Sequence, residues 1–600
     1  MPLLSGFQVT VDGQPLDDVL NINISQDIYN VGEIALYCRF ESMEDADSFL
    51  IEQSKKLLGT EVLIQTELIE PNSSSGKPGF QFLGIITEIQ GVKTDMSDNN
   101  GILLFGKSPE ILMQNRPKTR AFLDSTLKDI VNEVLKDYDQ GLLKPKVKPR
   151  NKQKFSYLVQ YNENDLEFLR RLSVTYGEWF YFNGSELIFG ENNPKDLDLT
   201  VGVDLEKFVF NLRTKANGFE LKTYDTLNDK VHSYSSSRIN PDGDLSTYGK
   251  FAHGVTKKIY PGSSVSEHSH WNVSDSDIPD AIKTATDLEV RSSAINHASI
   301  RGEGSHAGMS VGIVGAIKAQ KQNSRGTIDY GKYLFTRINH FIDHLNNYHN
   351  NFTGTSKEST LPENTNSRLF RESGPHVAEV TDNTDPEKLG RIRVKFSWVT
   401  GDKITQWIPV LSPYVTASAG FYFVPAVGSL VLIDFEGGNI DKPFCAGSLY
   451  HKKSTPEGDW AGNKNSENAK IHAIRTEGGN TIEFHDEDGD KLIRIYDTDN
   501  KNEIILNSTK GEISIRAKDK LSLDAKEIEI KASDGIKIEA GKGMKLKAQE
   551  ISSEAQTKME SKAANVEISA NASLKMEGSA SVKLASSGVM TIQGSLVKIN

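Results

Sequence analysis

Residues 526–548 read KEIEIKASDGIKIEAGKGMKLKA, and the pattern in this stretch decides how the C-terminal part of the chain folds. Each unit has an apolar residue, a polar residue and a second apolar residue, followed by a polar or glycine-containing turn. Between residues 513 and 597 the pairs recur in eleven steps, so the mean period is 84/11, or about 7.6 residues. An internal repeat this regular predicts a repetitive architecture.

The apolar positions of the repeat are the predicted core of this region. The core residues that we expect to face inward are Ile513, Ile515, Leu521, Leu523, Ile528, Ile530, Ile536, Ile538, Leu546, Val566, Ile568, Leu574, Val582, Leu584 and Ile592. Looser precursors of the pairs occur at 482/484, 493/495 and 504/506. The chain has no proline after Pro456 and no aromatic residue after Tyr496, which would be unusual for a globular core.

One unit of the repeat is too short to enclose a core. Its strand of three to five residues points two side chains inward, and at about 3.3 Å per residue the unit spans at most ~26 Å. That length suits one face of a prism, so we expect three chains to supply one face each and to leave no unpaired strand edge. The alternative is a single-chain β-meander, whose short strands would leave one sheet face exposed.

Charge and cysteine content exclude several classes of function. The net charge of -12 disfavours nucleic acid as the main partner. From residue 511 to 600 there are 14 Lys and Arg residues against 12 Asp and Glu residues, interleaved as expected for a solvated shaft. The two cysteines, Cys38 and Cys445, are interpreted as small buried residues, because two cysteines cannot form a disulfide framework.

The first region, residues 1–365, mixes strands with a few helices and predicts an α+β hub with β-barrel-like pieces. Asp124 or Ser125 is expected to cap a first helix, and Asn164 with Glu167 predicts a capping box for a second helix. A third helix is expected over residues 278–298. The predicted apolar face of the first helix consists of Leu127, Ile130, Val131, Val134 and Leu135.

The remaining chain divides into three parts by composition. Residues 366–453 carry about five short strands separated by turns, which favours a small closed barrel of the OB type. Residues 454–480 are expected to form a neck, and residues 481–600 an intertwined, triple-stranded β-helix needle. The fold class is therefore mainly β with an α+β hub.

Specific motifs in the hub, the barrel and the needle resemble one family. The hub carries YNENDLEFLRRL at 161–172 and GEWFYF at 177–182, with His340, Tyr348 and Phe352 further on. The barrel carries GPHVAEV at 374–380, LGRIRVKFSW at 389–398, FVPAVG at 423–428 and VLIDFEGG at 431–438, and NTIEFHD at 480–486 enters the needle. In this order they resemble the VgrG spike proteins of type VI secretion systems, which are similar to the hub and needle of contractile phage tails.

The resemblance implies a non-enzymatic homotrimer without a cofactor or a metal. It would sit on a ring-forming, Hcp-like tube protein within a baseplate, carry a PAAR-type tip protein and effectors or adaptors, and puncture target envelopes. Leu596, Val597, Lys598, Ile599 and Asn600 are the expected docking surface for the tip protein. Ser397 and Ala426 depart from the common pattern of the family, so the spike of an extracellular contractile injection particle stays open as an alternative.

The sequence disfavours several other kinds of chemistry. A β-helical tailspike that cuts polysaccharide would need facing carboxylates, but the candidates at 486–488 and 497–499 are expected in turns. The second group also lacks the glycine of a calcium loop. His268, His270, His340, His344 and His349 match no standard zinc spacing, and the glycines at 302–308 no phosphate loop. A passive adhesive fibre would need neither hub nor barrel.

The N-terminus lacks the basic and apolar regions of a secretory signal, and no apolar run approaches the ~18 residues of a membrane span. We therefore expect assembly in the cytoplasm on a baseplate and injection without a cleaved signal.

Overall fold

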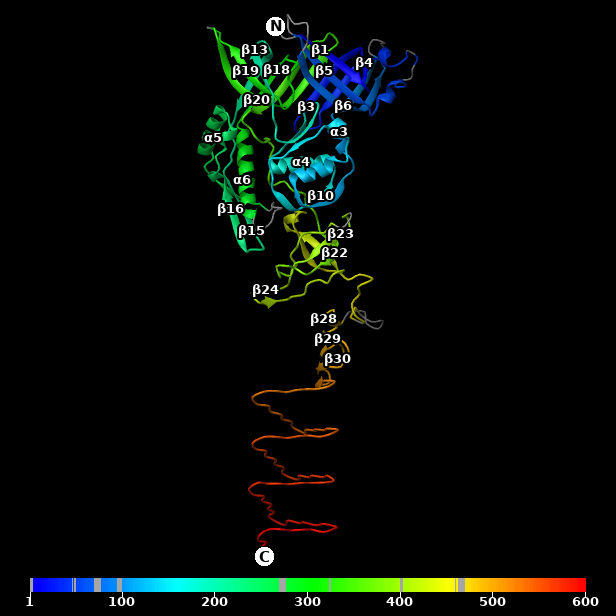
Figure 1. Ribbon diagram of the computed structural model, residues 1–600, viewed down its shortest axis with the longest axis vertical. Helices are drawn as coiled ribbons and strands as arrows, with labels where there is room; N and C mark the ends of the chain where they lie inside the picture. The colour runs from blue at the N-terminus through cyan, green and yellow to red at the C-terminus, as the bar shows by residue number, and fades with distance from the viewer. Residues whose placement is uncertain are drawn as a thin grey trace. The chain divides into compact units, whose positions relative to one another are not determined.

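Figure 1 shows a computed structural model of the chain. The structure describes residues 4–45, 47, 50–69, 77–93, 100–268, 277–322, 325–399, 403–458, 460–461 and 470–599. The chain forms two compact units, Met1–Ala469 and Lys470–Asn600. Their division falls inside the predicted neck, and the finer domain boundaries stay predictions.

A 13-stranded sheet dominates the first unit. In spatial order its strands are β19 (Val314–Gln320), β13 (Asp196–Val201), β14 (Leu205–Leu212), β18 (Ala298–Gly304), β21 (Tyr348–Ser356), β20 (Thr327–Asp343), β3 (Val19–Asp27), β4 (Glu33–Arg39), β7 (Gly101–Lys107), β6 (Lys77–Val92), β5 (Glu61–Ile69), β1 (Leu4–Val11) and β2 (Gln14–Pro15). Because β19 pairs with both β13 and β20, the first six strands close into a barrel, which confirms the predicted barrel-like pieces.

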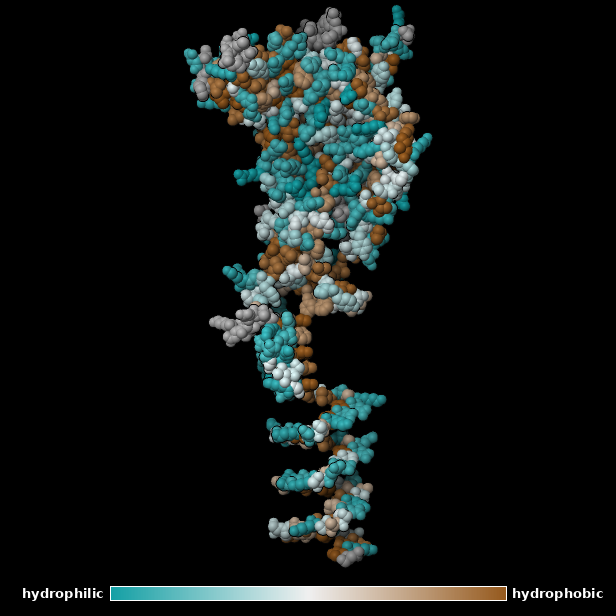
Figure 2. All heavy atoms as spheres, turned by 180° about the vertical axis from the view of Figure 1, so that it is seen from behind, coloured by the Kyte–Doolittle hydropathy of each residue, from teal (hydrophilic) through white to brown (hydrophobic). Residues whose placement is uncertain are grey.

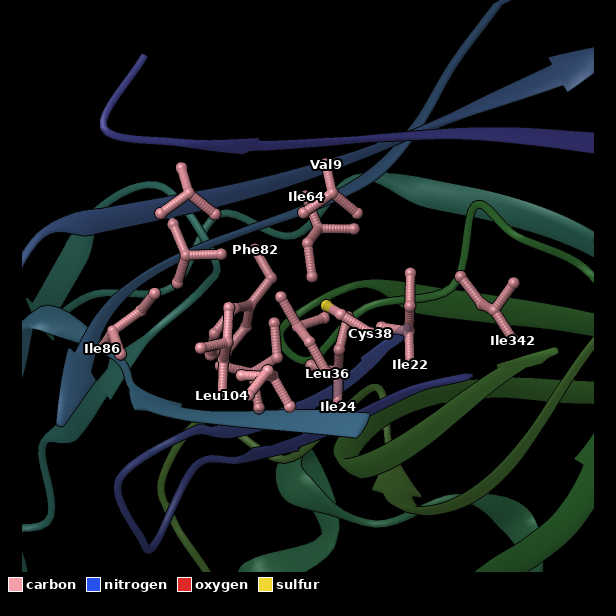
Figure 3. Packing of buried hydrophobic residues seen from close by; sticks show 14 of the residues in the cluster. Val9, Ile22, Ile24, Leu36, Cys38, Ile64, Phe82, Ile86, Leu104 and Ile342 are labelled. Atoms are coloured by element: carbon pink, nitrogen blue, oxygen red, sulfur yellow. The ribbon is translucent and has the colours of Figure 1, made fainter. Parts of the chain in front are cut away.

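Each half of this sheet encloses its own core. Val314, Phe335 and Ile338 lie inside the closed barrel. Figure 3 shows the other core, where Phe82, Leu104 and Cys38 from β6, β7 and β4 pack together. The alternation of apolar and polar residues along these strands produces this packing, because successive side chains point to opposite faces.

A layer of helices and short strands follows along the chain. It contains β8 (Lys118–Thr126), α2 (Leu127–Leu135), α3 (Gln140–Leu143), β9 (Lys146–Lys148), β10 (Lys154–Glu163), α4 (Asp165–Tyr176), β11 (Trp179–Phe182) and β12 (Leu187–Gly190). The predicted apolar face of α2 is buried, and the capping box of Asn164 and Glu167 on α4 is confirmed. The predicted cap of α2 is wrong: Thr126 accepts the hydrogen bond from Asp129 N, because β8 continues through the predicted capping residues.

A small subdomain carries β15 (Phe219–Asp225), β16 (Lys230–Ser235), β17 (Ser264–Glu267), α5 (Thr247–Ile259) and α6 (Ile278–Ile295). The third predicted helix corresponds to α6 and ends three residues earlier than expected. Sequence reasoning missed α5. Gly249 and Gly254 lower its helix propensity, and the large apolar residues Tyr248 and Phe251 lie on its exposed side rather than in the core.

The predicted small barrel is present after residue 375. Its sheet has the order β23 (Arg393–Phe396), β22 (His376–Asp382), β26 (Leu430–Phe435) and β27 (Pro443–Ser448). Residues 408–410 close the ring, since Ile408 bridges to Ile392 beside β23 and Val410 bridges to Cys445 on β27. This closing segment therefore makes isolated bridges where one of the predicted short strands was expected.

The second unit begins with a five-stranded antiparallel sheet, which we call the C-terminal sheet. Its strands follow chain order: β28 (Ile471–Arg475), β29 (Thr481–Glu487), β30 (Asp490–Tyr496), β31 (Glu503–Asn507) and β32 (Glu512–Arg516). No helix or strand is assigned over residues 517–599, all of which the structure describes. We call these residues the repeat segment.

Candidate assembly interface

One face of the C-terminal sheet is apolar. Directly opposed residues on its five strands form one row, and a second row runs beside it with His472 at its end. The first row is Ile474, Ile482, Ile495, Ile504 and Ile515, and the second is Phe484, Ile493, Leu506 and Ile513. Apart from the half-buried Ile482, these side chains are 37% to 74% exposed.

The opposite face of this sheet is closed by a polar network. Arg494 Nε donates to Glu503 Oε1 at 2.6 Å, and Arg516 Nη2 donates to the other carboxylate oxygen. Tyr496 Oη donates to Glu483 Oε1 at 2.6 Å. Burial alone would raise the pKa of Glu503, but the hydrogen bonds from the two arginines outweigh burial, and the pKa lies below its usual value.

The hairpins of the sheet share one backbone feature. Each of the four turns between its strands contains one residue with positive φ: Gly479, Gly489, Asn500 and Gly511. Tight hairpin turns favour such residues, because positive φ reverses the chain in the sense that fits the strand twist. No residue of the repeat segment, which is described throughout, has positive φ. The chain therefore turns corners after residue 516 without reversing in hairpins.

The repeat segment bends at the period that the sequence predicts. Bends lie at 518–519, 526, 533–534, 541–542, 549, 556–557, 564, 571–572, 579–580, 587–588 and 595, so successive bends are seven or eight residues apart. Each extended leg between two bends carries one apolar pair or one of the weaker single steps, as Figure 1 lets the reader follow from orange to red.

The legs do not satisfy their own backbone or cover their own apolar pairs. No backbone–backbone hydrogen bond is recorded within residues 517–599, each of which is described. The paired apolar side chains of the legs are 47% to 88% exposed, and Figure 2 shows open space between successive turns. Unpaired N–H and C=O groups and exposed apolar rows are both unfavourable. We therefore expect this segment to form an interface with a partner.

The polar residues of the legs point the other way. Lys537 lies between Ile536 and Ile538, and its Nζ is 2.6 Å from Glu539 Oε1. Lys575 and Glu577 pair in the same manner at 2.5 Å. Since residues two apart share a face of an extended chain, the charges occupy the face opposite the apolar pairs. Apolar and polar residues therefore alternate between the two faces of each leg, and the inward position of the apolar pairs stays a prediction.

The predicted core residues fall into two environments. Ile513 and Ile515 lie on β32 at the edge of the C-terminal sheet, and the other predicted core residues lie on legs of the repeat segment. Of the predicted docking surface, Leu596 and Ile599 are highly exposed, whereas Asn600 lies outside the described residues. Trimer packing and tip docking stay predictions.

The candidate catalytic and metal residues take structural positions. Asp486 and Glu487 end β29 at a hairpin, and Asp497 accepts hydrogen bonds from Lys501 N and Asn502 Nδ2 within the next turn. Among the residues that the structure describes, no three His, Cys, Asp or Glu side chains gather to hold a metal ion. His270 lies outside these residues.

The remaining candidates belong to the packed interior of the first unit. His340 is buried in stacking contact with Phe80, with ring centroids 4.0 Å apart, and burial lowers its pKa to about 3. A Cβ atom on Gly302 would lie 2.5 Å from the Phe352 ring, so close packing explains this glycine. Cys38 and Cys445 are free and buried, as predicted.

Two exposed apolar surfaces were predicted incompletely or not at all. One is the apolar face of the C-terminal sheet: the sequence predicted its looser pairs as part of the needle, but not that these strands pair within one chain. The other is an arm on the small barrel around β24 (Val415–Thr416) and β25 (Ala419–Gly420), where Tyr414, Tyr422 and Phe423 are exposed. In the sequence, apolar residues between barrel strands give no signal that separates an exposed arm from a core.

Comparison with known proteins agrees with this architecture. Residues 52–347 match the family described as phage tail baseplate hub, and residues 376–450 match the family described as type VI secretion system/phage-baseplate injector OB domain. The spike protein VgrG4b of Pseudomonas aeruginosa is 24% identical over 379 residues, which are 56% of this chain and 45% of that protein. The chain is similar to the VgrG spike proteins.

Two further VgrG proteins are similar to the chain. VgrG5 of the same bacterium is 22% identical over 391 residues, 57% of this chain and 46% of that protein. A chain of the solved Francisella PdpA–VgrG complex, in its lidded form, shares the fold with a TM-score of 0.53 and 10% identity, covering 86% of this chain and 80% of that chain. The chain therefore matches less than half the length of these two curated VgrG relatives.

Proposed function

We propose that this chain is the spike of a contractile injection apparatus of the type VI kind, acting as a homotrimer that is driven through a target envelope. The hub and the small barrel would sit on the tube and in the baseplate, and the repeat segments of three chains would form the needle. This role follows the resemblance to VgrG proteins and the geometry of the second unit.

The observation that carries the proposal is the repeat segment, whose backbone and apolar pairs have no partner in the single chain. Its legs are regular, bear apolar residues on one face and charges on the other, and lack any backbone partner within the described chain. Three such chains wound around one axis pair every strand with a neighbour and bury every apolar pair. A triangular cross-section is the smallest closed one, so the product is a thin and stiff rod.

Partners are proposed by the same reasoning. A tip protein would dock on residues 596–600, where the exposed Leu596 and Ile599 end the apolar column. The Francisella structure holds a VgrG together with PdpA, which supports the proposal that this spike also carries effector proteins. In this proposal the chain itself catalyses no reaction.

Among the described residues, no helix is long and apolar enough to span a membrane.

A truncation in the source cell tests the proposed function. The chain ending at residue 516 keeps the hub, the small barrel and the C-terminal sheet but loses the needle. We expect cells with this version to stop delivering effectors, while sheaths and tubes still assemble on the retained hub. A matched control replaces the outward-facing Lys545 with Gln and delivers as the native chain does. Normal delivery by the truncated chain would overturn the puncturing role.

A further inference from the structure

We propose that the C-terminal sheet is the registration element of the spike: three copies of its apolar face pack together and fix which legs of the three repeat segments pair. This inference rests on the proposed trimer and assigns separate roles in its assembly to the sheet and to the repeat segment. The sheet would select and align the chains, and the repeat segment would then wind from residue 517 onward.

The apolar face of the sheet continues directly into the apolar column of the repeat segment. Every strand from β29 to β32 presents two alternate apolar residues to this face, as most legs do. Strand β32 belongs to both patterns, since Ile513 and Ile515 are the first regular pair of the repeat and also the last members of the two rows. The same partners that cover the column after residue 516 therefore cover the face before it.

A second copy of this sheet is the occupant that the chemistry of the face favours. Its two rows hold nine apolar residues and, at one end, His472, and the described residues of the unit leave most of them exposed. The other face carries the network around Glu503 and Glu483, and Leu492 and Ile505 on that face are half-buried, so the apolar face is the one that most needs cover. Three identical faces around one axis cover each other and leave none exposed.

The repeat segment alone specifies its register only weakly. Its units are seven or eight residues long, and all but the weaker steps at Ile551 and Met559 carry an apolar pair, so a chain that slips by one unit still places most apolar pairs against apolar pairs. The sheet has no such freedom, because four hairpin turns fix each strand against the next within its own chain. Three packed sheets would therefore hold the three chains in a single register at residue 517, where the repeat segments begin.

Cross-linking of the full chain tests the packing directly. Ile504 lies near the middle of the first row, and we expect Ile504→Cys to give a disulfide-linked dimer under mild oxidation, because three such thiols meet near the axis. The background is low, since Cys38 and Cys445 are buried. Ser514→Cys, on the opposite face of β32, is the matched control and stays uncross-linked. Equal cross-linking of both variants, or none at Ile504→Cys, overturns the packing.

The oligomeric state of two full-length variants tests registration. Ile495→Asp puts a charge in the middle of the face, and we expect a monomer whose hub keeps its native hydrogen-exchange protection. Leu546→Asp puts the same charge in the repeat segment, and we expect a trimer with a frayed needle. A trimeric Ile495→Asp chain or a monomeric Leu546→Asp chain would overturn the inference. A monomeric native chain would remove the proposed trimer as well.

Discussion

The buried carboxylate of Glu503 makes the C-terminal sheet sensitive to acid. Because its pKa is lowered in the folded chain, its contribution to stability is complete above the unfolded pKa of about 4.3 and is lost as pH falls through the folded value. We predict that Glu503→Gln costs the sheet about 1–2 kcal/mol at pH 7 and reduces its acid sensitivity. Hydrogen exchange of β30 and β31 at pH 7 and pH 4 measures both effects. Glu512→Gln, on the exposed end of β32, is the control, and an acid response in Glu503→Gln equal to the native one would contradict the prediction.

A single glycine marks the last reversal of the chain. Gly511 has φ of +69°, and no heavy atom lies within 4 Å of the Cβ position. A left-handed conformation costs residues other than glycine about 1–2 kcal/mol, so we predict that Gly511→Ala destabilises the hairpin of β31 and β32 by this amount. Gly541→Ala, at a bend without positive φ, should change stability by less than about 0.5 kcal/mol. Equal effects of the two substitutions on urea unfolding would argue against the difference between hairpins and corners.

At the scale of elements, the repeat was predictable because its signal is periodic and local. The spacing of apolar pairs such as Ile536 and Ile538 fixes where the bends fall, and no distant contact alters it. The C-terminal sheet was harder to predict, because its pairs have the same composition and only their wider spacing separates them from the legs. That spacing leaves room for hairpin turns such as the one at Gly489, and turn geometry decides whether a strand pairs within its own chain.

Other elements were obscured by tertiary context. The helix α5 has apolar residues on its exposed side, and the cap of α2 depends on how far the preceding strand continues. The closing segment of the small barrel makes only isolated bridges, although its alternation predicts a full strand. In each case local propensity was overruled by packing that the sequence does not display.

The legs of the repeat segment allow a matched comparison of two neighbouring residues. Leu546 belongs to an apolar pair, and Lys545 lies on the opposite face of the same leg. Burying a carboxylate in the interior of a thin trimer costs several kcal/mol, so Leu546→Asp should expose residues around the substitution to protease. Lys545→Asp should leave the native digestion pattern unchanged. Digestion of both variants at the same rate would show that the two faces of the leg are equivalent.

At the scale of the whole molecule, the two units have different roles in the proposed spike. The first unit has several packed cores besides the exposed arm of its small barrel, whereas the second exposes apolar rows and unpaired backbone that three copies would cover. The hub and barrel families match the first unit alone. We therefore expect the needle to be the part whose structure depends on assembly.

The solution mass of the purified native chain, measured by light scattering, tests this account most directly. Three copies of a 66.4 kDa chain make about 199 kDa, and we predict this mass together with protease resistance of residues 517–599. A particle near 66.4 kDa in which these residues are equally resistant would contradict the account, because the repeat would then close within one chain.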